Sequence, residues 1–320
     1  MGYGSYSEEA HRAITFARAK AAPREVFQRN DCDPKMNPRG VKYRESRDSA
    51  GHPDSLGIVF ALDVSGSMGE IPHQLATRTL PTFMSSVRTI LPSPHVLFMA
   101  FGNAYADKSP LQVGQFESEA QLIDRWLAAT HLEGGGGALG ESYDLAMYFA
   151  ARHTAMDCWE KRKKKGYFFM TGDETPWMGL ARHHVAGLIG DSLQQDIPVW
   201  EVVRELQQKF HTFFLIPDEK RAATENCGAV WTALMHERCI VLDTPEDAAA
   251  IAALAIGIEE GVLTDEKAID RCIVERLHTP LDARERLFET ISPYAEARWK
   301  GPIAGPNVLQ RRTDVPNVRG

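Results

Sequence analysis

The chain has 320 residues, of which 43% are hydrophobic and 25% are charged. This composition and length are typical of a soluble globular protein. They exclude a small fold that depends on disulfides or bound metals, a fibrous chain and a disordered chain. The 36 Lys and Arg residues face 43 Asp and Glu, which gives a formal net charge of -7 and a pI near 5.9. This net negative charge does not favour binding to nucleic acid or to anionic lipid through the overall charge of the protein.

Three further features narrow the class of protein. The longest apolar run, from Ala248 to Ile258, is too short to span a bilayer, which takes about 20 residues, and it predicts a buried helix. The first 25 residues carry charges at intervals and lack the apolar core of a secretory signal, so we expect a cytoplasmic protein. The five cysteines are widely spaced without a C-x-x-C pair, which predicts reduced thiols and no cysteine zinc site.

Residues 1–56 form a polar N-terminal extension. Between residues 30 and 55, prolines and glycines alternate with many charges, a composition typical of a loop laid over a domain surface or of a mobile arm. The sequence leaves these two alternatives open.

From residue 57 onward, short apolar runs alternate with helical patterns. Each run is too short for a helix and too uniformly apolar for a half-exposed strand, which predicts a strand covered on both faces. The predicted strands are residues 58–62, 96–101, 167–170, 213–216 and 240–242. Residues 111–116 predict an additional antiparallel strand at the edge of the sheet.

Segments with helical spacing lie between these strands. Apolar residues recur at that spacing from Ile71 to Val87 and again from Leu139 to Ala150, and Thr244 with Pro245 starts a further helix. Helices that connect parallel strands cover both faces of a sheet. The sequence therefore predicts an α/β fold with a doubly wound, mainly parallel, Rossmann-like sheet over residues 57–261. Residues 262–320 are predicted to form a C-terminal helical extension, whose helix starts at Thr264, and a tail.

A cluster of oxygen-bearing side chains follows the first predicted strand. Asp63, Ser65 and Ser67 stand at steps of two on a turn that contains Gly66 and Gly69. At the carboxyl edge of the sheet, where open α/β folds place ligands, these side chains can turn three oxygens toward one point. Oxygen ligands without His or Cys suit magnesium better than zinc, with manganese or calcium as alternatives.

This D-x-S-x-S pattern resembles the metal-ion-dependent adhesion site of von Willebrand factor A (vWA) domains, in particular that of intracellular, bacterial-type members. The resemblance covers residues 57–261 and implies two further loops. One is the glycine-rich turn at Gly134–Gly137, and the other is the loop after the third main strand, which contains Asp173. The resemblance implies the metal ligands Asp63, Ser65, Ser67 and Asp173.

The sequence departs from the family at one ligand. Gly137 stands where the family has a threonine, so we expect weaker or more water-rich metal binding, with waters completing the coordination sphere. Glu133 and Glu141 are the acids that could approach the metal from this turn. Trp177 and Met178 directly follow the Asp173 loop and are candidates for a contact surface at the rim of the site.

The sequence shows no nucleophile paired with a base, so we expect no enzyme activity. The vWA resemblance implies a protein-interaction module in which an Asp or Glu of a protein ligand completes the metal coordination, with an AAA-type ATPase or another assembly component as partner. Two alternatives stay open. One is a metal-dependent phosphoester hydrolase that uses Asp63, Asp173 and Glu174. The other, for which the acidic pI is unfavourable, is a nucleic-acid-binding adaptor that uses Lys161–Lys165.

Overall fold

The computed structural model describes residues 29–75, 80–132 and 140–301, together with residues 7, 9, 13 and 27. Within this part of the chain, a six-stranded central sheet has the order β10, β9, β6, β2, β3, β4. All neighbouring strands are parallel except β3 and β4. The strands, in that order, are Cys239–Val241, Phe210–Ile216, Gly166–Thr171, Leu56–Asp63, Pro94–Phe101 and Leu111–Val113. The protein therefore has a mixed α/β fold with a mostly parallel sheet.

All five predicted strands form, but only four of them, β9, β6, β2 and β3, lie inside the sheet. The fifth, β10, spans Cys239–Val241 in place of the predicted 240–242, lies at an edge of the sheet and is only partly buried. Every residue of β2, β3 and β6 is buried, as continuous apolar sequence predicts for strands covered on both faces. The predicted edge strand is confirmed as β4 but ends at Val113, because the chain bulges there and its pairing with β3 resumes only at Glu117, opposite Val96.

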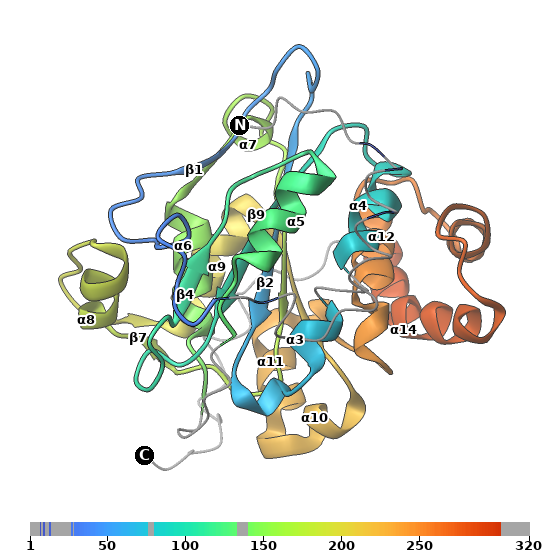
Figure 1. Cartoon of the computed structure of the whole chain (residues 1–320). Coiled ribbons are helices and arrows are strands. Elements are labelled where there is room, and N and C mark those ends of the chain that lie inside the picture. Colours follow the sequence, from blue (N-terminus) through green and yellow to red (C-terminus); the bar gives the residue numbers. More distant parts are fainter. Residues whose placement is uncertain are drawn as a thin grey trace.

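Helices lie on both sides of this sheet (Figure 1). On one side α4 (Leu80–Arg88) packs against α12 (Ala248–Glu259), which also contacts α14 (Leu281–Lys300). On the other side α6 (Tyr143–Arg152) packs against α9 (Val199–Lys209). Among the described residues, the other α-helices are α3 (Ile71–Gln74), α5 (Ala120–Ala128), α7 (Asp157–Glu160), α8 (Arg182–His184), α10 (Glu219–Ala223), α11 (Cys227–Met235) and α13 (Glu266–Arg271).

The helix patterns explain which faces are buried. In α9, Val199, Val202, Val203 and Leu206 are buried, at the three-to-four-residue spacing of one helix face. The apolar run from Ala248 to Ile258 forms α12 as predicted, preceded by a 3₁₀ turn at Pro245–Asp247, and it is buried except at Ala250.

Three predicted helices differ in extent from the prediction. The pattern from Leu139 to Ala150 corresponds to α6, which begins at Tyr143 and ends at Arg152. The pattern from Ile71 to Val87 corresponds to α3 and α4, and residues 76–79 lie outside the described part. The predicted start at Thr264 is wrong by two residues, because Asp265 is the N-cap of α13 and its carboxylate accepts a hydrogen bond from the Ala268 amide at 2.8 Å. After α13 the chain continues as a π-helix, Cys272–Arg276.

The described part of the N-terminal extension lies on the domain surface. Strand β1 (Arg44–Ser46) pairs in parallel with β5 (Thr154–Met156), and the Val113 amide donates to the Met36 carbonyl at 2.8 Å. For residues 29–56, these contacts decide between the two alternatives in favour of a surface-bound segment.

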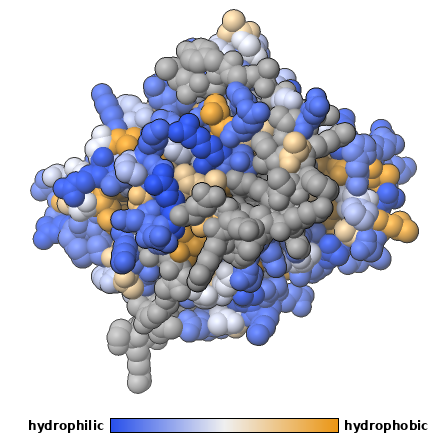
Figure 2. All heavy atoms as spheres, in the orientation of Figure 1, coloured by the Kyte–Doolittle hydropathy of each residue, from blue (hydrophilic) through white to orange (hydrophobic). Residues whose placement is uncertain are grey.

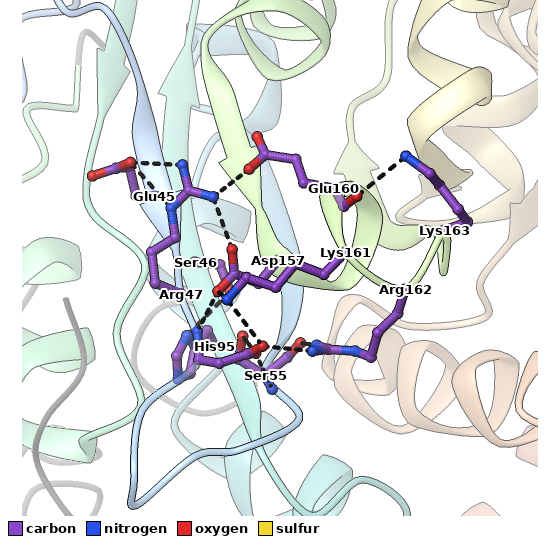
Figure 3. Close-up of polar contacts among 11 residues, drawn as sticks. Glu45, Ser46, Arg47, Ser55, His95, Asp157, Glu160, Lys161, Arg162 and Lys163 are labelled. Atoms are coloured by element: carbon purple, nitrogen blue, oxygen red, sulfur yellow. Dashed lines mark hydrogen bonds and ion pairs between the residues drawn. The ribbon is translucent and has the colours of Figure 1, made fainter.

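An ion network fixes this segment at the amino ends of the strands (Figure 3). Asp157 of α7 accepts hydrogen bonds from Arg47 at 2.9 Å and from Lys161 at 2.6 Å. Arg162 binds Asp48 at 2.7 Å and also donates to the carbonyl of Ser55, the residue directly before β2. In Figure 1, α7 lies at the upper end of the sheet and α10 and α11 lie at the lower end.

Where described residues face the viewer in Figure 2, the apolar residues do not form a broad patch. Figure 2 shows mostly hydrophilic residues on the side turned to the viewer, with apolar residues in small separate patches outside the grey atoms. In the described part of the chain, no helix combines the length and the apolar character needed to span a bilayer. None of the five cysteines forms a disulfide. The tail from residue 302 lies outside the described residues.

Candidate functional site

The first site residue closes a strand and the next two lie in the turn that follows it. Asp63 is the last residue of β2, and Ser67 lies in a single 3₁₀ turn, Gly66–Met68. The Ser65 amide donates to Asp63 Oδ1 at 2.9 Å, which closes a tight turn directly after the strand. Gly69 then takes a φ of 54°, a backbone conformation that favours glycine. Asp63 and Ser65 are buried, whereas Ser67 is exposed.

The fourth predicted residue reaches the same turn from the neighbouring strand. Asp173 lies two residues after the end of β6, which pairs with β2. Its Oδ1 accepts a hydrogen bond from Ser67 Oγ at 2.8 Å, and Ser67 Oγ lies 3.0 Å from Ser65 Oγ. The structure thus brings Asp63, Ser65, Ser67 and Asp173 together at the carboxyl edge of the sheet.

The spacing of these oxygens fits a small hard cation. Magnesium holds oxygen ligands at about 2.1 Å in an octahedron, which puts neighbouring ligands about 3 Å apart. The 3.0 Å and 2.8 Å separations along Ser65, Ser67 and Asp173 are ordinary hydrogen-bond lengths that are also compatible with that spacing. The two carboxylates and two hydroxyls suit magnesium, manganese or calcium in their chemistry. Across the described residues, no three His, Cys, Asp or Glu side chains group closely enough to hold a metal ion by themselves.

Asp63 is a carboxylate without a cationic partner. It is fully buried, and among the described residues no Lys, Arg or His forms an ion pair with it. Burial, reinforced by the negative charge of Asp173, raises the pKa of Asp63 to about 7. A buried carboxylate that has no cationic partner favours the binding of a positive charge next to it.

Tyr143, in the first turn of α6, holds Asp63 in place. Its hydroxyl donates to Asp63 Oδ2 at 2.9 Å and accepts from the Glu174 amide at 3.2 Å. A Cβ atom at Gly172 would lie 2.3 Å from the Tyr143 hydroxyl oxygen, so this position requires glycine. The sequence presented Tyr143 only as one apolar residue of a helix face, and its position directly after the glycine turn was the one available sign of a role in the site.

Two more acids surround the site. Glu141 is 3% exposed, and its Oε2 has no hydrogen-bond partner among the described residues. Burial and the charges of Asp63 and Glu174 raise the pKa of Glu141 to about 9. Glu174 Oε2 accepts from the Gly140 amide at 2.9 Å. The predictions for Glu133 and for Gly134–Gly137 lie outside the described residues.

Arg221 of α10 is the cation that the sequence analysis missed. Its Nε donates to Asp173 Oδ2 at 3.0 Å, and its Nη2 donates to the Ser67 carbonyl at 3.3 Å. Its Nη1 binds Asp218, the N-cap of α10, at 2.5 Å. Because α10 follows β9, Arg221 reaches the site from a third strand end.

Aromatic side chains form a rim next to these loops. Tyr105 is 56% exposed and Met178 is 49% exposed. The Tyr105 ring packs edge-on against Trp177 with centroids 4.9 Å apart and against His184 at 4.4 Å. Gly140, at the end of the glycine turn, lies under the Trp177 indole. The two residues predicted for the rim therefore lie beside the Glu174 loop, and Met178 is exposed.

The basic run at residues 161–165 is engaged within the chain. Its side chains contact Asp157 and Asp48, the Ser55 carbonyl, the Glu160 carbonyl, Glu260 and the Gln207 carbonyl. These contacts lie at the amino ends of the strands, away from Asp63 and Asp173. They favour a structural role for the run.

No protein-family model and no curated protein sequence matches the chain. Similar solved structures include the pilus adhesin SpaC from Lactobacillus rhamnosus GG in its open conformation, with 13% identity, a TM-score of 0.45 and coverage of 67% of this chain and 31% of the adhesin. Proximal thread matrix protein 1 from the mussel byssus has 9% identity, a TM-score of 0.40 and coverage of 67% and 48%. The chain thus spans less than half of either protein. With TM-scores below 0.5, these similarities assign neither a family nor a function.

Proposed function

We propose that the chain is a vWA-type protein-interaction module that binds magnesium through Asp63, Ser65, Ser67 and Asp173. An Asp or Glu of a partner protein then completes the coordination of the metal. The observation that carries this proposal is the row of oxygens from Ser65 through Ser67 to Asp173, spaced at 3.0 Å and 2.8 Å. The buried Asp63 is joined to this row by the Ser65 amide. The bound metal would supply a positive charge with an open coordination position.

The strand order supports the same proposal. Numbered along the chain, the strands of the central sheet have the order 3-2-1-4-5-6. This order matches that of doubly wound sheets, except that the third strand is antiparallel. Ligands of such sheets bind where the order reverses, between the first and fourth strands. Asp63 ends the first of these strands and Asp173 follows the fourth.

Metal binding is tested by thermal unfolding. The purified protein is melted in EDTA and at increasing MgCl₂, beside Asp63→Ala and a control, Asp54→Ala, whose side chain is exposed at the opposite end of the sheet. We expect magnesium to raise the melting temperature of the wild type and of Asp54→Ala but not that of Asp63→Ala. No shift in the wild type, or an equal shift in Asp63→Ala, would remove the metal from the proposal.

The partner is tested by affinity capture from a cytosolic extract in magnesium or in EDTA. A specific partner is retained in magnesium by the wild type, is released by EDTA and is not retained by Asp63→Ala. By the vWA resemblance we expect an AAA-type ATPase or another component of a cytoplasmic assembly. A partner that is retained equally well in EDTA and by Asp63→Ala would contradict the role of the metal.

The phosphoester hydrolase remains the alternative, and it makes a different prediction. Incubation with generic phosphomonoesters and phosphodiesters plus manganese would then give turnover that Asp63→Ala abolishes. We expect none, because the side chains in contact with Asp63 and Asp173 in the described structure include neither His nor Lys.

A further inference from the structure

Arg221 binds the same loops that would hold the metal. Its guanidinium donates to Asp173 at 3.0 Å and to the backbone carbonyl of Ser67 at 3.3 Å. It therefore joins the turn after β2 to the loop after β6, and Asp218 fixes its own position. Its side chain is 28% exposed, whereas Asp173 is 7% exposed.

The charges around the site show why this contact matters. Among the described residues, Asp173 has one ion-pair partner, Arg221, and Asp63 has none. Without a metal, the guanidinium is therefore the positive charge that balances Asp173. A carboxylate as buried as Asp173 is costly when it has no partner.

We propose that Arg221 competes with the metal for Asp173. Without magnesium, Arg221 holds the loops of the site together, and it lowers the affinity of the site for magnesium. The inference rests on the proposed metal site. A divalent ion bound among Ser65, Ser67 and Asp173 would lie close to the guanidinium, and two positive charges repel. Asp173 would then share its negative charge between Arg221 and the metal.

The competition has two consequences. The metal-free protein keeps its site loops ordered, because Arg221 already bridges them. Magnesium binds more weakly than it would to a site with two carboxylates and no competing cation. The fraction of the protein with bound metal therefore depends on the magnesium concentration. A partner acid that neutralises part of the added positive charge would strengthen metal binding, and the metal would strengthen partner binding to the same degree.

The test compares three variants of the full chain. Arg221→Gln removes the charge, and Arg221→Lys retains it. Arg286→Gln removes a matched ion pair elsewhere, since Arg286 and its partner Asp247 are 30% and 7% exposed. Magnesium affinity is measured by isothermal titration calorimetry in low salt, and melting temperatures are measured in EDTA and in MgCl₂.

We expect Arg221→Gln to melt at a lower temperature than the wild type in EDTA and to bind magnesium on the order of tenfold more tightly. Its stabilisation by magnesium should exceed that of the wild type. Arg221→Lys should bind magnesium much as the wild type does. Arg286→Gln should lose stability with no change in magnesium affinity.

Each other outcome is decisive. If the wild type binds magnesium and Arg221→Gln binds it equally well or more weakly, the competition is overturned and the metal site stands. If Arg221→Gln binds magnesium and the wild type does not, the competition is supported and magnesium binding by the wild type is contradicted. The absence of binding by wild type and variant alike overturns both proposals.

Discussion

The two ends of the central sheet carry opposite kinds of charge clusters. At the amino ends, Asp157 is 4% exposed and is paired with Arg47 and Lys161. Although burial alone raises the pKa of Asp157, hydrogen bonds from Lys161 and the Asp48 amide help to lower it to about 2. At the carboxyl ends, burial raises the pKa of Asp63 to about 7 and that of Glu141 to about 9.

This difference separates a structural cluster from a candidate site. The network in Figure 3 matches its acids with cations and fixes the N-terminal segment. The acids at the opposite end have Arg221 as their one cationic contact among the described residues. Buried acids with raised pKa values cost stability, and such groups concentrate at functional sites. Neutralising Asp157 at one end and Glu141 at the other should therefore change stability in opposite directions.

The largest effect is expected at the amino ends. Asp157→Asn should lower the free energy of unfolding by about 2–3 kcal/mol at pH 7, because the contacts that lower the pKa of Asp157 to about 2 stabilise its charged form in the fold. Urea denaturation measures the loss. Glu160→Gln, in the same network but 46% exposed, should change stability by less than about 0.5 kcal/mol. A loss no larger for Asp157→Asn than for this control would remove the contrast between the two ends.

Acid should act on Asp157 in the corresponding way. Its folded pKa of about 2 lies below the ordinary value of 3.8. The stability that it contributes is therefore present above about pH 4 and is lost as the pH falls toward 2. The difference between the wild type and Asp157→Asn should shrink over that range.

Glu141 should show the opposite sign. Its folded pKa of about 9 lies above the ordinary value of 4.5, so between these values the native state keeps a proton that the unfolded chain releases. Stability in EDTA therefore falls as the pH rises, by up to about 1.4 kcal/mol per pH unit.

Glu141→Gln removes this dependence. The variant should gain roughly 2 kcal/mol relative to the wild type between pH 6 and pH 8, whereas the exposed control Glu289→Gln should not. Urea denaturation at a series of pH values measures both. Parallel pH profiles for the wild type and Glu141→Gln would show that Glu141 is ionised in the fold.

A smaller effect is expected from Tyr143→Phe. The change removes the donor to Asp63 and the acceptor of the Glu174 amide, which should cost about 1–2 kcal/mol and weaken magnesium binding several-fold. Tyr148→Phe, in the same helix, loses a hydrogen bond of 2.7 Å to Asp191 and serves as the control. It should lose comparable stability without any change in magnesium affinity. Equal effects of the two variants on magnesium would separate Tyr143 from the site.

The smallest effect is expected from the basic run. Lys164→Gln removes an ion pair whose lysine is 46% exposed and should cost at most about 0.5 kcal/mol. If the amino ends are a balanced cluster, Lys163→Gln and Lys164→Gln should also leave retention on an anionic column unchanged. A marked drop in retention would favour the nucleic-acid alternative.

The predictability of the fold differed between its parts. The four inner strands were predictable because a strand covered on both faces is apolar along its whole length. The same reasoning wrongly placed β10 at the centre, although this strand lies at the edge of the sheet. The β1–β5 pair was not, because Arg44 to Ser46 is polar and acquires its partner only when α6 delivers Thr154 to Met156 to the same edge. The early end of β4 likewise depends on a bulge that leaves no mark in the apolar pattern.

The candidate site divides in the same way. The sequence by itself placed Asp63, Ser65 and Ser67 on one turn after a buried strand, and the vWA resemblance added Asp173 to them. The structure brings the four together because β2 and β6 are neighbouring parallel strands whose carboxyl ends meet at one edge. Only the tertiary structure decided that Tyr143 and Arg221 join them. Both lie in helices far along the chain, and a helix pattern predicts which face is buried, not which atom a hydroxyl or guanidinium at its end will contact. That choice follows from how α6 and α10 pack against the strand ends.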